Sequence, residues 1–157
     1  KKFDLDDLRY EKVIIMCDAD VDGAHIAALL ATFFYKSMPG LIEAGRLYMA
    51  QPPLYRLTQG GKTLYADTDE EKDQLIETEF KKGKVEVGRF KGLGEMTPPQ
   101  LKSTTMNPAT RSLARVRVTD EMREVADQLV ETLMGKKPEL RFQYIQDHAP
   151  FVDAVDV

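Results

Sequence analysis

The sequence predicts an α/β fold, in which a mainly parallel sheet with helices on both faces is followed by a mostly helical C-terminal part. Residues 13–17 (VIIMC) form a continuous apolar run, the pattern of a strand that is covered on both faces. Apolar side chains then recur at helical spacing from Ile26 to Met38. A buried strand followed by an amphipathic helix is the typical beginning of a βαβ unit.

Short strands are expected along the rest of the chain. Gly60 and Gly61 separate two segments with strand character, which predicts a hairpin whose glycines supply the positive φ of a tight turn. The segments with strand character are 46–50, 54–57, 63–66, 85–90 and 113–118.

Three further helices are predicted from signals at their starts. Thr68 and Glu71 form a capping box, in which a hydroxyl and a carboxylate accept hydrogen bonds from free backbone amides, and this helix should run to about Lys82. The other two predicted helices follow Thr97, with prolines at its first positions, and Thr119. A last short helix is expected from Pro138 onward.

Composition excludes several classes of protein. Hydrophobic residues at 43% and charged residues at 31% are values of a globular chain and not of a disordered one. The single cysteine, Cys17, excludes an internal disulfide framework and fits a reducing cytoplasm. The apolar runs are too short to span a membrane, so no membrane association is expected.

Charge is distributed unevenly around a net value of -4. Residues 81–118 carry 9 basic and 2 acidic side chains, whereas residues 1–80 carry 9 and 15, and residues 119–157 carry 4 and 9. Electrostatic fields act locally and are screened within about 10 Å, so the basic segment suits contact with phosphates. Three solvated surfaces of uneven charge would give the same pattern.

An acidic turn follows the first predicted strand, with carboxylates at Asp18, Asp20 and Asp22 before Gly23. An EF-hand calcium loop is excluded, because its twelfth position would be Leu29 and a helix should precede it. Capping of the next helix needs only one aspartate. The third interpretation is a Mg²⁺ site at the carboxyl end of a strand, where the ion serves phosphoryl transfer.

Three segments resemble one family. They are KVIIMCDADVDGAHI at residues 12–26, YMAQPPLY at residues 48–55 and RFKGLGEM at residues 89–96. The first is similar to the DxDxDG segment of the Toprim fold, and all three occur in this order in the B subunits of type IIA topoisomerases. The resemblance covers residues from about Leu8 to about Ile145.

The resemblance implies Mg²⁺-dependent breakage and rejoining of DNA. Asp18 and Asp20 correspond to the metal-ligating pair, and Asp22 to a ligand or a nearby carboxylate. A further Glu ligand is expected in an upstream EGDSA segment, which these residues do not contain. The resemblance therefore divides the chain into a Toprim part at residues 1–96, without its first strand, and a C-terminal tail at residues 97–157.

The implied partners are DNA and an A subunit that supplies the attacking tyrosine, within an A₂B₂ complex in the bacterial cytoplasm. ATP would act in a domain outside these residues, and the fragment alone is expected to be inactive. The short span before RFKGLGEM and the tail LMGKKPE at residues 133–139 favour the topoisomerase IV branch over the gyrase branch.

Three basic side chains are further site residues. His25 and Lys91 are expected near the scissile phosphate, and Arg89 and Lys91 at the DNA, although each could instead be a surface residue. Two rival functions are a Mg²⁺ phosphatase or nuclease of HAD or primase type, in which the GLGEM segment has no place, and a docking module without activity. Activity with and without the A subunit separates them.

Overall fold

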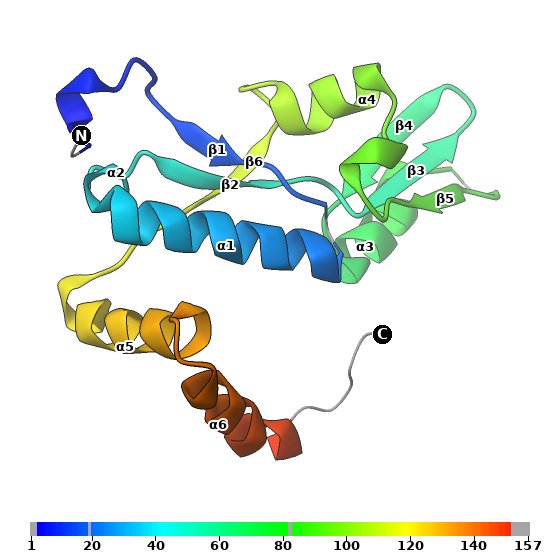
Figure 1. The fold of residues 1–157 in the computed structure, drawn as a ribbon. Helices are drawn as coiled ribbons and strands as arrows, with labels where there is room; N and C mark the ends of the chain where they lie inside the picture. Colours follow the sequence, from blue (N-terminus) through cyan, green and yellow to red (C-terminus); the bar gives the residue numbers. More distant parts are fainter. Residues whose placement is uncertain (1–2, 19, 82, 152–157) are drawn as a thin grey trace. The chain divides into compact units, whose positions relative to one another are not determined.

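A computed structural model describes residues 3–151 with the exception of Ala19 and Lys82 (Figure 1). The chain divides into two compact units, each built from segments that are distant in the sequence. The first unit contains Lys1–Val13, Ala28–Leu47 and Val116–Val157, and the second contains Ile14–Ala27 and Tyr48–Arg115. The expected boundary near residue 96 divides the chain along the sequence by resemblance to a family, and not into compact units. It stays a prediction.

The predicted βαβ start is present as β1, α1 and β2. Strand β1 spans Val13–Ile15, helix α1 spans Val21–Ser37 and strand β2 spans Leu47–Gln51. The arrows of β1 and β2 point in the same direction, and the sheet has the order β1-β2-β6 (Figure 1). Of the apolar run, Ile15 is buried and Met16 is exposed, so the predicted cover on both faces is only partial. Leu47, at the start of β2, is buried.

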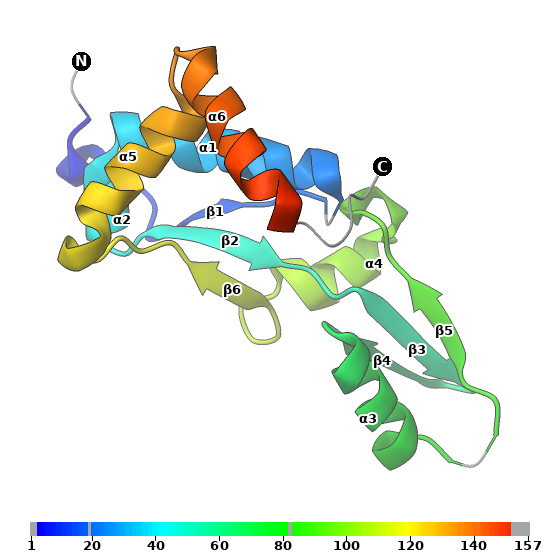
Figure 2. The ribbon, with the colours of Figure 1, turned by 90° about the horizontal axis from the view of Figure 1, so that it is seen from below.

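A second sheet lies within the second unit, in the order β4-β3-β5 (Figure 2). Its strands are β3 (Tyr55–Gln59), β4 (Lys62–Ala66) and β5 (Glu86–Arg89). The turn between β3 and β4 has Gly60 at φ 59°, a conformation that glycine adopts without steric cost, so the predicted hairpin is confirmed. Tyr55, Leu57, Ala66, Phe80 and Phe90 are the buried apolar residues around this sheet.

The strand pairings differ from the mainly parallel sheet that was expected. Strand β6 (Ser112–Arg115) pairs with β2 in the antiparallel sense, and β3 is antiparallel to both β4 and β5. For β3 and β4 the reason is the tight turn at Gly60 and Gly61, because a two-residue turn can join only antiparallel strands. Parallel neighbours need long crossover connections. The α/β class and the helical C-terminal part are confirmed.

Helix α3 (Asp69–Glu79) begins at the predicted capping box. The Thr68 hydroxyl accepts a hydrogen bond from the Glu71 amide at 3.1 Å, and the Glu71 carboxylate accepts one from the Asp67 amide at 2.7 Å. In a standard capping box the carboxylate accepts a hydrogen bond from the amide of the N-cap residue, which here is Thr68. In this helix it binds the amide of the preceding residue, Asp67. The helix ends earlier than predicted, because Phe80 leaves helical conformation and is buried.

The remaining helices of the second unit are short. Helix α4 spans Pro98–Leu101 and continues as a π-helical turn over Lys102–Met106. The predicted start at Thr97 is confirmed as a second capping box, in which the Gln100 side chain accepts a hydrogen bond from the Thr97 amide at 2.9 Å.

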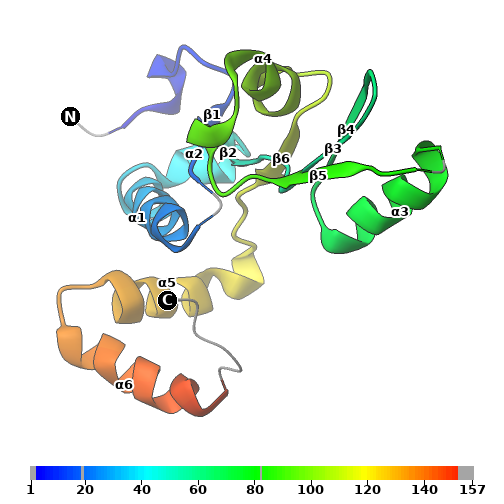
Figure 3. The same ribbon diagram turned by 90° about the vertical axis from the view of Figure 1, so that its right-hand side faces the viewer.

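The first unit is mainly helical (Figure 3). Helix α2 spans Pro39–Glu43, α5 spans Arg123–Met134, and α6 spans Pro138–His148 and packs against α5. Polar contacts join α5 to the preceding helices, with Tyr35 donating to Asp127 at 2.6 Å and Arg123 to Glu43 at 3.1 Å. Over the described residues, none of the helices combines the length and the apolar character needed to cross a membrane.

Candidate metal-binding site

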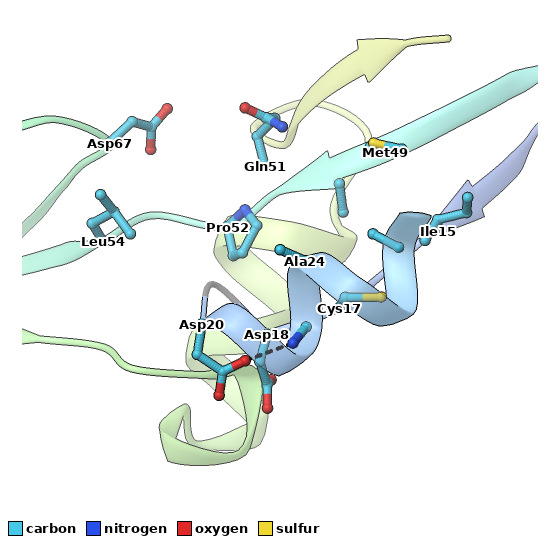
Figure 4. A pocket seen from close by; sticks show the side chains of 13 residues that line it. Ile15, Cys17, Asp18, Asp20, Ala24, Met49, Gln51, Pro52, Leu54 and Asp67 are labelled. Atoms are coloured by element: carbon cyan, nitrogen blue, oxygen red, sulfur yellow. Dashed lines mark hydrogen bonds between the residues drawn. The ribbon is translucent and has the colours of Figure 1, made fainter. Parts of the chain in front are cut away.

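The acidic turn between β1 and α1 lines a cavity of about 370 Å³ in the second unit (Figure 4). The cavity has an apolar part that includes Ile15 and Met49, and the Asp18 and Asp20 side chains lie close together at one side of it. Both aspartates are exposed. The structure therefore brings together two of the three predicted metal-ligating carboxylates, at the end of the first strand.

Asp18 is held by a turn that is distant in the sequence. The backbone amide of Leu93 donates a hydrogen bond of 2.7 Å to Asp18 Oδ1. A Cβ atom on Gly92 would lie 2.7 Å from Asp18 Cγ, closer than such atoms approach, so the carboxylate occupies the space that a side chain at residue 92 would need. Glycine in a strand context can indicate the close approach of another group.

Asp20 has a structural role in addition to its place at the cavity. Its Oδ1 accepts a hydrogen bond of 2.7 Å from the Gly23 amide, and its carbonyl accepts one from the Ala24 amide at 2.9 Å. These are the contacts of a residue that caps the start of α1. Gly23 itself has no room for a side chain, because its Cβ would lie 2.0 Å from the Asp18 carbonyl oxygen. One aspartate thus accounts for the capping of α1, in agreement with the argument that a cap does not require three.

Asp22 and His25 lie in the first turns of α1, and both are exposed. Within the part of the chain that is described, no three Asp, Glu, His or Cys side chains are grouped so that they could hold a metal ion. Asp22 is therefore not brought together with Asp18 and Asp20 into one group. Its role as a ligand, and the role of His25, stay predictions.

The predicted DNA-contacting side chains lie on the segment that reaches Asp18. Arg89 ends β5, and its guanidinium carbon lies 6.0 Å from the centre of the Tyr55 ring. Lys91 is exposed and directly precedes Gly92, and its backbone amide donates to Glu95 Oε2 at 2.8 Å. The acidic turn therefore contacts the basic segment at residues 91–93. This contact brings together two of the three motifs, at residues 12–26 and residues 89–96.

Asp67 is a cavity residue that the sequence alone did not indicate. It lines the same cavity as Asp18 and Asp20, on the opposite side (Figure 4). Desolvation, with a smaller contribution from the negative charge of Glu71, raises the pKa of Asp67 above its usual value. Its position just before a capping box gave no signal of this location.

Comparison with known proteins agrees with the motifs. Residues 1–52 match the family model of the Toprim domain, and residues 82–146 match that of the DNA gyrase B subunit, carboxyl terminus. The B subunit of DNA topoisomerase 4 from Bartonella bacilliformis is 58% identical over 99% of this chain and 23% of its own length. The chain belongs to the B-subunit family of type IIA DNA topoisomerases.

Two other relatives of this family distinguish its branches. The B subunit of DNA topoisomerase 4 from Caulobacter vibrioides is 60% identical over 98% of this chain and 22% of its own length. The B subunit of DNA gyrase from Metamycoplasma hominis is 47% identical over 99% of this chain and 24% of its own length. The predicted preference for the topoisomerase IV branch is confirmed. The chain spans less than a quarter of the length of these curated relatives.

The donor set of this topoisomerase segment fits a magnesium ion. Asp18 and Asp20 each direct one oxygen, Oδ1, to a backbone amide, and each carboxylate carries a second oxygen. Mg²⁺ in proteins is commonly bound through one or two carboxylates, with water and substrate phosphate completing its shell. Two adjacent exposed carboxylates are sufficient for that mode of binding.

Proposed function

We propose that this chain is the metal-binding part of a topoisomerase IV B subunit that breaks and rejoins DNA with Mg²⁺. The observation that carries the proposal is the adjacent placement of Asp18 and Asp20 at the end of β1, beside the basic turn at residues 91–93. Family membership supports it, because the relatives named above include B subunits of DNA topoisomerase 4.

In this proposal the two aspartates bind the ion, and nearby basic side chains bind the DNA backbone. Mg²⁺, when bound, would stabilise negative charge on the phosphate oxygens during phosphoryl transfer. Arg89 and Lys91 would contact phosphates of the DNA backbone, because they lie on the segment whose Leu93 amide holds Asp18. His25 would donate a hydrogen bond or a proton to the phosphate from the first turns of α1. Asp22 would act through water.

The partners of the proposed activity lie outside this chain. An A subunit would supply the tyrosine that attacks the DNA backbone, and the complex would contain two copies of each subunit. ATP would be bound by another part of the B subunit. Since the gyrase relative is also similar over 99% of the chain, supercoiling by a gyrase-type complex is the alternative to decatenation and relaxation.

The test is Asp20→Asn in the full-length B subunit, assembled with its A subunit. Asparagine caps helices about as well as aspartate, so α1 and the thermal unfolding temperature should be preserved. Loss of one metal-ligating carboxylate should lower DNA cleavage by at least about 100-fold. Asp120→Asn is the matched control, because Asp120 is a fully exposed carboxylate in the first unit. Cleavage close to the wild-type rate in Asp20→Asn would disprove the assignment.

A further inference from the structure

We propose that the turn at Gly92 and Leu93 is a positioning device that holds the Asp18 carboxylate in the conformation that binds the metal. The inference rests on the proposed function. It assigns a role in the metal site to Gly92 and Leu93, whose side chains cannot bind a metal. Its starting point is the 2.7 Å hydrogen bond from the Leu93 amide to Asp18 Oδ1, across 75 residues of sequence. A backbone donor on one carboxylate oxygen fixes the orientation of the other.

Gly92 is required at this turn for space and not for backbone conformation. Its φ is -160° and its ψ is 171°, an extended conformation that every residue type adopts. A Cβ at this position would lie 2.7 Å from Asp18 Cγ and 2.9 Å from each carboxylate oxygen. All three atoms of the carboxylate therefore lie against the backbone of Gly92. A methyl group here would displace the part of Asp18 that is proposed to bind the ion.

The turn is held in place by contacts at both of its ends. The Lys91 amide donates to Glu95 Oε2 at 2.8 Å, and the Met96 amide donates to the Leu93 carbonyl at 3.2 Å. Phe90 and Met96, which flank the turn, are both buried. The Leu93 amide is thus presented to Asp18 by a segment that is anchored on each side, and this arrangement restricts the rotamers of the carboxylate.

Gly94 provides a matched control within the same turn. It lies two residues from Gly92, and a Cβ added to it meets no atom within 4 Å. Gly92→Ala and Gly94→Ala therefore introduce the same methyl group into the same segment, one against the Asp18 carboxylate and one into open space. A difference between the two variants reports contact with Asp18 and not a general effect of alanine on the turn.

The test measures binding of Mn²⁺, as a paramagnetic substitute for Mg²⁺, to the full-length B subunit without nucleotide, together with thermal unfolding. Gly92→Ala should weaken Mn²⁺ binding by about 10–100-fold, the range seen when a supporting group of a metal ligand is lost. Gly94→Ala should bind as the wild type does. Wild-type affinity in Gly92→Ala, with Asp20→Asn still impaired, would overturn the positioning role and leave the proposed function intact. Affinity independent of Asp20 would instead contradict the proposed function.

Hydrogen exchange gives a second measurement, which applies also if Gly92→Ala fails to fold. The Leu93 amide should exchange slowly in the wild-type protein and faster in Asp18→Ala, since the acceptor of its hydrogen bond is lost. The Lys91 amide, which donates to Glu95, should keep its protection in Asp18→Ala. Equal exchange of the Leu93 amide with and without Asp18 would show that the two residues are not coupled, and would overturn the inference.

Discussion

The hydroxyl of Tyr55 donates a hydrogen bond of 3.0 Å to the carboxylate of Asp69 and so ties the start of α3 to the central strand of the second sheet. Lys72 forms a salt bridge with the same carboxylate, with its Nζ 2.6 Å from Asp69 Oδ1. The Lys72 ammonium also lies 4.9 Å from the centre of the Tyr55 ring. The Arg89 guanidinium lies 6.0 Å from that ring centre. A buried tyrosine therefore connects helix α3 to a residue that is proposed to bind DNA.

The first prediction is that Tyr55→Phe lowers the free energy of unfolding by about 1 kcal/mol, the contribution of one hydrogen bond at a partly exposed site. The aromatic ring stays in the core, so only the contact with Asp69 is lost. Chemical denaturation measures the change. Tyr65→Phe is the control, because the Tyr65 hydroxyl makes no hydrogen bond among the residues that the structure describes. Equal stability of the two variants would contradict the prediction.

The second prediction concerns stability in acid. The hydrogen bond from Lys72, followed by that from Tyr55, holds the pKa of Asp69 below its usual value of 3.8. The ionised carboxylate therefore stabilises the fold above that value, and this contribution is lost as the pH falls from 3.8 through the lower pKa of the folded state. Asp69→Asn should flatten the dependence of stability on pH in this acid range.

Unfolding by denaturant at several pH values between neutral and acid measures that dependence. Glu70→Gln is the matched control, since Glu70 lies in the same first turn of α3 and makes none of the contacts of Asp69. The prediction fails if Asp69→Asn and the wild-type protein lose stability in parallel as the pH falls.

Features that depend on neighbouring residues could be predicted from the sequence. The caps at Thr68 and Thr97, the hairpin at Gly60 and the strand before Asp18 all arise within a few residues, and each of them is present. The antiparallel pairing of β2 with β6 and the contact of Asp18 with Leu93 join segments more than sixty residues apart. Such long-range contacts depend on tertiary packing, and the sequence pattern within a few residues does not determine that packing.

The three aspartates of the acidic turn could be predicted only in part. Residues at alternate positions share one face only while the chain is extended. Helix α1 begins at Val21, directly after Asp20, so Asp22 follows the helical rotation and does not join the other two carboxylates. The pair of Asp18 and Asp20 comes together because both precede the helix. Placing the third carboxylate would have required knowledge of where that helix begins.

The third prediction is that Lys91→Glu weakens DNA binding and reduces its dependence on salt. Each phosphate contact releases condensed counterions, so loss of one contact should lower the slope of log affinity against log salt by about one unit. Binding of the full-length complex to DNA at several salt concentrations measures the slope. Lys136→Glu, an exposed lysine of the first unit, is the control with the same charge change. An unchanged slope would place Lys91 away from the DNA.

The fourth prediction is that the 157-residue chain alone binds Mg²⁺ only weakly. Its described residues bring two carboxylates together but no group of three, and Mg²⁺ gives up its water shell reluctantly. Without substrate phosphate to complete the shell, we expect a dissociation constant in the millimolar range, or about 4 kcal/mol.

Titration calorimetry with Mg²⁺ measures this dissociation constant. Asp20→Asn should bind more weakly than the wild-type chain, and Asp120→Asn should bind equally. A plasmid nicking assay without the A subunit should show no cleavage. Micromolar binding or clear nicking would mean that these residues already form a complete site.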